Sequence, residues 1–223
     1  MRSWSYLLIS FASLAQAAPP AQVEIAYELT RNGSTMAEVV DRLEHSNGNY
    51  QLTETWKGKG VFALLGRAKR TSHGTLVRDV LQPLEFVDER TGRDTARAWF
   101  DWKAKAVTMR YKGRTRTEPL PDNSQDGLTF LLLFSFIPPP SQPMTLHVFN
   151  GRGGSEHVYQ VAGREQVTVP AGQFDAVKLL RGKNGDRGEI WLATAHSYLP
   201  IRIVVIEKDG VRYEQVATRI TIP

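Results

Sequence analysis

Four cationic side chains occupy alternate positions between residues 110 and 116, which makes this segment the most regular array of charged groups in the sequence. They are Arg110, Lys112, Arg114 and Arg116. In one continuous β-strand alternate residues share a face, so these cations would form a ladder that binds phosphate or carboxylate groups of lipid headgroups or envelope polymers. The alternative is a solvated strand face that a turn at Lys112-Gly113 divides, because glycine inside a strand pattern often marks a break.

Other groups that could perform chemistry are few. The sequence has no cysteine, which excludes a thiol nucleophile, and it has no Gly-x-Ser-x-Gly motif. Among the five histidines, His157 directly follows an acidic residue, Glu156. Adjacent residues on a strand point to opposite faces, so the pattern predicts neither a metal site nor a cofactor. Acidic pairs for sugar hydrolysis could be drawn from Asp101, Glu118, Asp175 and Glu189, but such carboxylates occur in any exported protein.

The most apolar segment of the chain runs from Leu128 to Ile137 and is followed by three prolines. Helix-capping residue types, Asp122, Asn123 and Ser124, precede it, and Pro138 would end a helix. We therefore expect a helix over residues 124–136, about 20 Å long at ~1.5 Å per residue, which is too short to span a bilayer core of ~30 Å. A fully buried strand remains the alternative, because periodicity alone does not separate the two.

This apolar helix predicts an interior that either packs as a dry core or leaves an apolar cleft. A helix that is apolar on nearly all sides must be enclosed, here by a curved sheet. The residues expected to form the wall of a ligand site are Leu128, Leu131, Leu132, Phe134, Trp56 and Phe100. The same side chains could equally fill the interior, since inward-facing strand residues are core by default, and the sequence leaves both possibilities open.

The remaining segments are typical of short antiparallel strands. Residues 23–29 alternate between apolar and polar types, and Asn32-Gly33 after them is a strong hairpin signal. Asn47-Gly48 and Asp209-Gly210 give the same signal. The fold class that we predict is mainly β, with an antiparallel, strongly curved sheet or half-open barrel and one apolar helix packed inside.

The first seventeen residues have the pattern of a secretory signal peptide. Arg2 precedes an apolar core, and Ala15-Gln16-Ala17 is a small-x-small cleavage site. We expect residues 1–17 to be removed and residues 18–223 to form one domain in the periplasm, without a lipid anchor because no cysteine is available to carry it. Removal of Arg2 lowers the formal charge from +5 to +4, which is too balanced to predict binding of nucleic acid.

A second apolar segment, Val61 to Leu65, lies between two basic clusters at residues 57–59 and 67–70. This arrangement is typical of a loop or short helix that touches a membrane surface. It is equally consistent with a lid that packs over the mouth of the sheet.

Several motifs together resemble the bacterial family called domain of unknown function 3108, and the likeness covers nearly all of the mature chain. The motifs are Phe100-Asp101-Trp102, Leu120-Pro121, Gln125-Asp126, residues 169–176, Ile190-Trp191-Leu192-Ala193 and residues 198–203. The resemblance implies an exported, β-rich envelope protein with no agreed enzymatic activity and no catalytic residues. In architecture the family is also similar to the half-open barrels of periplasmic lipoprotein carriers, an analogy of fold alone.

Three functional hypotheses follow from the sequence. The first is a non-catalytic periplasmic protein that binds or carries an apolar or amphiphilic envelope molecule such as a lipid. The second is an interaction or scaffold protein that contacts a membrane surface or anionic envelope polymers through the basic strand. The third is a hydrolase acting on the cell wall. The sequence makes no prediction about oligomeric state.

Overall fold

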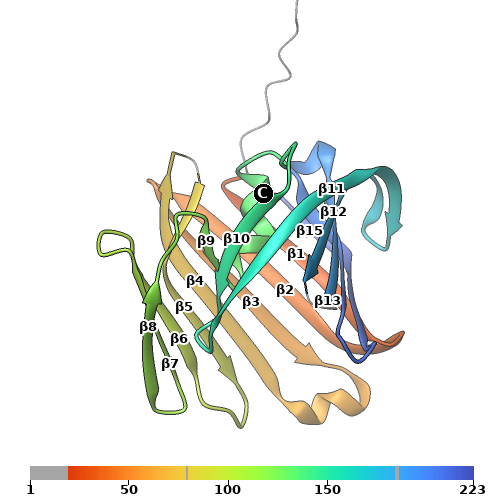
Figure 1. The fold of residues 1–223 in the computed structure, drawn as a ribbon. Coiled ribbons are helices and arrows are strands. Elements are labelled where there is room, and N and C mark those ends of the chain that lie inside the picture. Colours follow the sequence, from red (N-terminus) through yellow and green to blue (C-terminus); the bar gives the residue numbers. More distant parts are fainter. Residues whose placement is uncertain (1–19, 79, 184–185) are drawn as a thin grey trace, which may run out of the picture.

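The computed structural model describes residues 20–78, 80–183 and 186–223. The predicted signal peptide, residues 1–17, lies outside the described residues. Within them the protein is mainly β, and its strands form one large, mostly antiparallel sheet of fifteen strands (Figure 1).

The first half of the sheet is an uninterrupted antiparallel meander in chain order. Its strands are β1 (Gln22–Arg31), β2 (Ser34–Ser46), β3 (Asn49–Gly58), β4 (Arg67–Val77), β5 (Val80–Arg90), β6 (Ala96–Asp101), β7 (Ala106–Tyr111) and β8 (Arg114–Pro119). A short 3-10 helix, η1 (Gly60–Leu65), interrupts the meander between β3 and β4.

The second half of the sheet joins the first where β15 pairs with β1. Its strands are β9 (Ser124–Asp126), β10 (Met144–Phe149), β11 (Gly154–Val169), β12 (Gly172–Lys183), β13 (Asp186–Ala193), β14 (Leu199–Ile206) and β15 (Arg212–Thr221). All neighbours are antiparallel except β9 and β10, which are parallel.

The hairpins form at the predicted dipeptides. Asn32 and Gly33 have φ angles of 50° and 82°, and Asn47 and Gly48 have 49° and 74°, the positive values that a tight two-residue hairpin requires. Gly210 likewise has a φ of 83° in the turn between β14 and β15. The alternating strands that these turns connect are confirmed.

The sheet does not close, and its strands do not curl into the half-open barrel that the sequence predicted. The strand order ends at β8 and β9, and these two strands are not hydrogen-bonded to each other. Away from the β1–β15 junction, side chains of the second half contact β5 instead. Gln125 Nε2 donates to the carbonyl oxygen of Leu81 at 3.0 Å, and Arg152 Nη1 donates to Asp88 Oδ2 at 2.7 Å. Figure 1 shows β10 and β11 crossing in front of the first half, with the short helix behind them.

The predicted helix is much shorter than residues 124–136. It consists of α1 (Thr129–Leu132) followed by the 3-10 turn η2 (Leu133–Ser135). Residues 124–126 instead form β9, and the carboxylate of Asp126 accepts the backbone N–H groups of Leu128 and Thr129 at 2.8 and 2.9 Å. Because Asp126 satisfies these otherwise unpaired donors, the helix begins only after it.

The helix segment connects two clusters of buried side chains. Leu128 and Leu132 pack with residues from both halves of the sheet, whereas Leu133 and Phe134 pack with strands β10 to β14. The apolar run therefore anchors the second half of the sheet against the first.

Candidate functional site

An inner cleft of about 560 Å³ lies between the helix segment and both halves of the sheet. This volume falls within the range of roughly 300–1,000 Å³ that is usual for small-molecule sites. The cleft is lined by Leu29, Met36, Glu54, Trp56, Arg70, Arg90, Arg93, Gly127, Phe130, Leu131, Tyr159, Arg181, Gly188, Ile190, Ile203, Val204, Val205, Glu207, Tyr213 and Gln215.

The floor of the inner cleft is apolar. Leu29 of β1, Ile190 of β13 and Ile203 of β14 are all buried, and they have this position because inward-facing residues alternate along each strand. Phe130 and Leu131 of the helix segment complete the wall and are only partly buried. The apolar surface they present is available to a ligand.

Four arginines line the inner cleft against two glutamates. Arg70 and Arg90 come from β4 and β5, Arg93 from the turn after β5, and Arg181 from β12. Arg93 is exposed, as is Glu207, so these two residues mark the mouth. A guanidinium group stays charged at any physiological pH and offers several N–H donors, which makes this end of the cleft suited to an anion.

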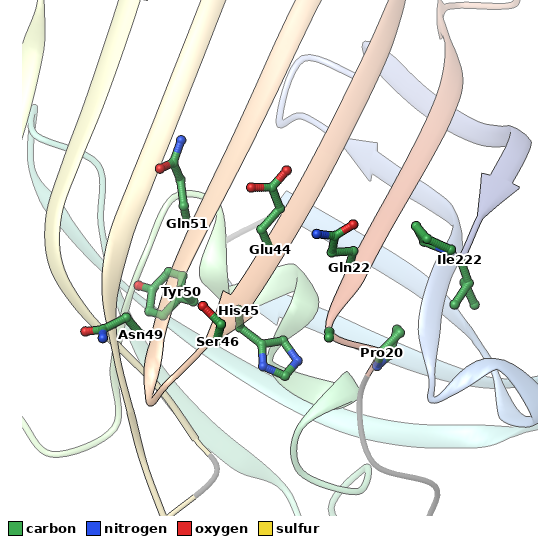
Figure 2. A pocket seen from close by; sticks show the side chains of 11 residues that line it. Pro20, Gln22, Glu44, His45, Ser46, Asn49, Tyr50, Gln51 and Ile222 are labelled. Carbon is green, nitrogen blue, oxygen red and sulfur yellow. The ribbon is translucent and has the colours of Figure 1, made fainter.

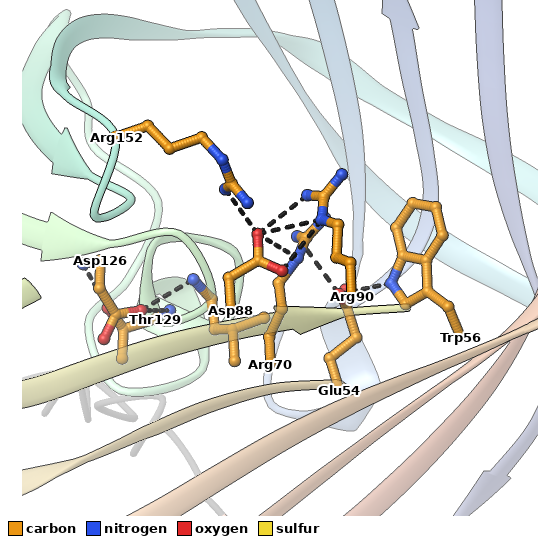
Figure 3. A network of polar contacts seen from close by, with 9 residues as sticks. Glu54, Trp56, Arg70, Asp88, Arg90, Asp126, Thr129 and Arg152 are labelled. Atoms are coloured by element: carbon orange, nitrogen blue, oxygen red, sulfur yellow. Dashed lines mark hydrogen bonds and ion pairs between the residues drawn. The ribbon is translucent and has the colours of Figure 1, made fainter. Parts of the chain in front are cut away.

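A network of ion pairs holds two of these arginines in place (Figure 3). Arg90 Nε and Nη2 donate to the carboxylate of Asp88 at 3.0 and 2.9 Å, and Arg70 Nη1 lies 3.2 Å from Glu54 Oε1. Arg152, from the second half of the sheet, also donates to Asp88. The Nε of Arg70 is buried and forms no hydrogen bond within the described residues, but it lies 3.8 Å from Asp88 Oδ2 and so contributes its charge to the network.

Asp88 stays ionised in this network. Burial raises the pKa of its carboxyl group, but hydrogen bonds from Arg90 and Arg152 and the charge of Arg70 outweigh burial, and the net pKa is lower than usual. Hydrogen bonds from Arg90 and Arg152 and the nearby charge of Arg70 give this buried carboxylate the compensation that a buried charge needs.

Two other carboxyl groups behave in the opposite way. Asp41 and Glu54 are both buried and lie directly opposite each other on β2 and β3. Burial raises the pKa of each, the charge of Glu54 raises that of Asp41 further, and Arg70 lowers both without reversing the shift. Like charges opposite each other on neighbouring strands repel, so the pair favours a state in which it retains a proton.

Asp126 and Thr129 link the helix segment to the sheet on one side of this network (Figure 3). Asp126 Oδ2 accepts a hydrogen bond from Ser72 of β4, and Ser72 Oγ lies 3.0 Å from the hydroxyl group of Tyr50 on β3. Since Asp126 also receives the first N–H groups of the helix, it fixes the distance between Leu131 and the arginines of β4 and β5.

The predicted ligand-binding residues separate into two groups. Trp56 and Leu131 line the inner cleft. Leu128, Leu132, Phe134 and Phe100 are instead buried in the packed core. The two possibilities left open by the sequence, dry core and ligand cleft, therefore apply to different residues of the same segment.

The predicted basic ladder is divided between two strands. Lys112 and Gly113 form the turn between β7 and β8, with φ angles of 50° and 71°. Arg110 pairs with Thr115, whereas Met109 pairs with Arg116 and Tyr111 with Arg114. Paired residues share a face, so Arg114 and Arg116 lie on the face opposite to Arg110. The expectation of four cations on one face is wrong because the glycine ended the strand.

The arginines of the inner cleft were not recognised from the sequence. Glu54 and Trp56 alternate on β3, Arg70 lies on β4, and Asp88 and Arg90 alternate on β5, whereas no strand was predicted from the sequence for residues 67–90. The available signal was that these charged residues fall on the same parity as the apolar residues Leu52 and Phe86. Charged residues on a buried face are exceptional.

A second hollow, of about 660 Å³, lies at the far end of β2 and β3, beside Pro20 and Ile222 (Figure 2). Its lining includes Glu44 and His45, which are consecutive residues on β2 and therefore point to opposite faces. These side chains do not converge on a common ligand, and the hollow has no cluster of charge comparable to that of the inner cleft.

Two further observations concern the described part of the chain. It contains no group of three histidine or acidic side chains arranged to hold a metal ion. Nor does any helix within it have both the length and the apolar character needed to cross a bilayer.

The fold and the cleft define an open, antiparallel β protein with an interior site that combines apolar and cationic groups. The chain belongs to the family described as "Protein of unknown function (DUF3108)", whose model matches residues 23–216. The family resemblance noted in the sequence is thereby confirmed.

Two solved structures are similar to this chain. One is a candidate lipoprotein from Parabacteroides distasonis, with 7% identity, a TM-score of 0.42, and coverage of 92% of this chain and 97% of that one. The other is a candidate exported protein with a YmcC-like fold from Bacteroides fragilis, with 13% identity, a TM-score of 0.38 and the same two coverages. Similarities this low support no argument about this chain. No curated protein matches the sequence.

Proposed function

We propose that this protein is a non-catalytic binding protein of the periplasm whose ligand is an anionic amphiphile, an acyl chain that ends in a carboxylate or phosphate group. The observation that supports this proposal is the composition of the inner cleft, which combines an apolar floor with four arginines. The export that it requires rests on the signal-peptide pattern of residues 1–17.

The apolar tail of the ligand would lie between the helix segment and the floor of the sheet. Leu131 and Phe130 would contact it from the helix segment, and Ile190 and Ile203 from the strands. Each methylene group removed from water contributes about 0.8 kcal/mol, so a chain that fills the cleft would bind without any specific polar contact along its length.

The head of the ligand would lie toward the mouth, near Arg93 and Arg181. Arg70 and Arg90 already have carboxylate partners in Glu54 and Asp88, whereas no ion pair within the described residues involves Arg93 or Arg181. Arg181 Nη1 does lie 3.3 Å from His157 Nε2, a contact that orients the guanidinium group without neutralising it.

The test is a titration of a fluorescent fatty acid in detergent-free buffer, with a fatty alcohol of equal length as the neutral comparison. We expect saturable binding of the acid, weaker binding of the alcohol, and loss of binding in Leu131→Glu, which places a carboxylate in the cleft. Leu84→Glu is the matched control, because Leu84 is an exposed leucine of β5 outside the cleft.

Leu131 is chosen rather than the neighbouring Leu132, because Leu132 is fully buried and a charge there would unfold the protein. Equal affinity for acid and alcohol would contradict the role of the arginines. Absence of saturable binding to either ligand would contradict the proposal as a whole.

A further inference from the structure

The 3-10 helix η1 carries the most exposed large apolar side chains of the described chain. Leu64 is 93% and Val61 is 79% exposed. A single exposed leucine is ordinary on a protein surface, but these two residues lie within one turn of a loop that extends beyond the end of the sheet between β3 and β4 (Figure 1).

The protruding loop has a defined shape. Phe62 N donates to the carbonyl oxygen of Lys59 at 3.0 Å, and Lys59 N donates to that of Met36 on β2 at 2.9 Å. The chain folds back so closely that a Cβ atom at Gly58 would lie 2.2 Å from the carbonyl oxygen of Phe62, which requires glycine there. These contacts fix the conformation of the loop and hold Val61 and Leu64 in the solvent.

Cations lie at the base of the loop, on the face of the sheet opposite to the inner cleft, because Lys57 is the neighbour of the cleft residue Trp56 on β3. Lys57 and Arg67 face each other across the ends of β3 and β4, and Lys69 follows on the same face. All three are exposed, and none makes an ion pair within the described residues. Lys59 is paired with Glu38 at 3.3 Å. Apolar side chains at the tip with cations behind them complement an anionic lipid surface.

The loop lies beside the mouth of the inner cleft. Arg67, which follows η1, accepts a hydrogen bond from Thr91 N and donates its own N–H to Thr91 Oγ1, both at 3.0 Å. Thr91 lies two residues before Arg93 at the mouth, and Met36, which anchors the other side of the loop, lines the cleft itself. The loop and the mouth of the cleft therefore lie at the same end of β3 and β4.

We propose that η1 is a membrane-docking loop: Val61 and Leu64 insert into the interface of an anionic bilayer, Lys57, Arg67 and Lys69 contact the headgroups, and the mouth of the inner cleft is held at the lipid surface. This inference rests on the proposed function for its purpose, the exchange of an amphiphile with a membrane. Its test does not depend on that function, because docking is measured without any ligand in the cleft.

The absence of cysteine from the sequence permits a direct experiment. Leu64→Cys, labelled with an environment-sensitive fluorophore, is mixed with vesicles of phosphatidylcholine alone or with added phosphatidylglycerol. We expect a blue shift with the anionic vesicles and quenching by lipids brominated on their acyl chains. Leu84→Cys carries the same label on an exposed leucine of β5 and should show neither effect.

Unlabelled variants measure the energetic contribution in a vesicle sedimentation assay. Leu64→Glu should lower the partition coefficient on anionic vesicles about tenfold or more, and Leu84→Glu should leave it unchanged. Raising the salt concentration should weaken binding of the wild type, because exposed charges are screened.

Two results would overturn the docking loop: no binding of the wild type to anionic vesicles, or equal binding of Leu64→Glu and the wild type. Failure of the proposed function would give a different result. The protein would bind anionic vesicles normally but would not bind the fluorescent fatty acid. A circular dichroism spectrum and a thermal unfolding midpoint equal to those of the wild type would show that Leu64→Glu is folded.

Discussion

Two groups of arginines in this protein differ in what surrounds them. In the inner cleft, Arg70 and Arg90 come from adjacent strands and are held by the buried carboxylates of Glu54 and Asp88. On the hairpin of β7 and β8, Arg114 and Arg116 lie at the open edge of the sheet and are exposed. The sequence drew attention to the second group, because its cations are close together along the chain.

The difference shows that spacing in the sequence is a weaker guide to a site than position relative to the interior. The pair of Arg116 with Glu118, 2.8 Å long, is largely in solvent, where such pairs contribute between about 0 and 1 kcal/mol. The carboxylate of Asp88 is 2% exposed and has three guanidinium partners. Removing a partner from a buried network costs far more, because charges remain without compensation.

The largest expected effect comes from breaking the buried network. Asp88→Asn should lower the free energy of unfolding by about 3 kcal/mol, since it removes the charge that Arg70, Arg90 and Arg152 share. Urea denaturation of the variant measures it. Glu118→Gln is the matched control on the exposed hairpin and should cost less than about 1 kcal/mol. Equal losses in the two variants would remove the distinction between the regions.

The next effect concerns the anionic head of the ligand. Replacing both Arg93 and Arg181 by glutamine should lower the affinity for the fluorescent fatty acid at least about tenfold. Hydrogen bonds from charged donors contribute about 1.5–3 kcal/mol each. The same double change at Arg114 and Arg116 should leave the titration unchanged. If the hairpin variant lost affinity instead, the binding site would lie at the edge of the sheet.

A pH-dependent effect should come from the pair of Asp41 and Glu54. Because burial raises the pKa of both groups, the unfolded chain releases these protons at lower pH than the folded protein does. The free energy of unfolding should therefore fall as the pH rises above the ordinary range of carboxyl groups, about 4.

Asp41→Asn removes one of the two acids and should make that fall smaller, as urea denaturation at pH 5 and pH 8 would measure. Asp88 does not obscure the comparison, because its pKa is lowered and its contribution is lost only in more acidic solution. A steeper fall of the free energy of unfolding in the variant would contradict the conclusion that Asp41 and Glu54 retain a proton.

The smallest effect is expected on the exposed hairpin. Reversing the charge of Arg114 and Arg116 to glutamate should change the free energy of unfolding by no more than about 0.5 kcal/mol, the usual size for surface substitutions. Thermal unfolding of the double variant would measure it. A loss of several kcal/mol would mean that the hairpin takes part in the core.

Local signals predicted the meander well and long-range contacts poorly. Asn32-Gly33 and Asn47-Gly48 require no tertiary context to form a hairpin, and both did so. The length of the helix depended on Asp126, whose partner Ser72 is 54 residues away, so capping residues nearby in sequence gave the wrong start. The inner cleft could not be predicted for the same reason, since Leu131 and Arg181 of the second half line one cleft with Arg70 of the first half only when the two halves assemble.

Leu131 and Trp56 show how far residue types alone can lead. Both line the inner cleft, whereas Leu132 and Phe134, which were expected to form the same wall, are packed in the core. Along a short helix, one position in the sequence decides between a cleft and a packed contact. Contacts with neighbouring strands decide between the two, and the sequence of the helix segment does not specify those contacts.

The central claim, that the inner cleft holds an anionic amphiphile, is tested most directly by native mass spectrometry with lipid extraction. The mature protein would be purified from the periplasm without detergent, alongside Leu131→Glu and Leu84→Glu. The account predicts an additional mass of an acyl-containing anion on the wild type and on Leu84→Glu, and none on Leu131→Glu. Three identical spectra without bound ligand, from folded protein, would contradict it.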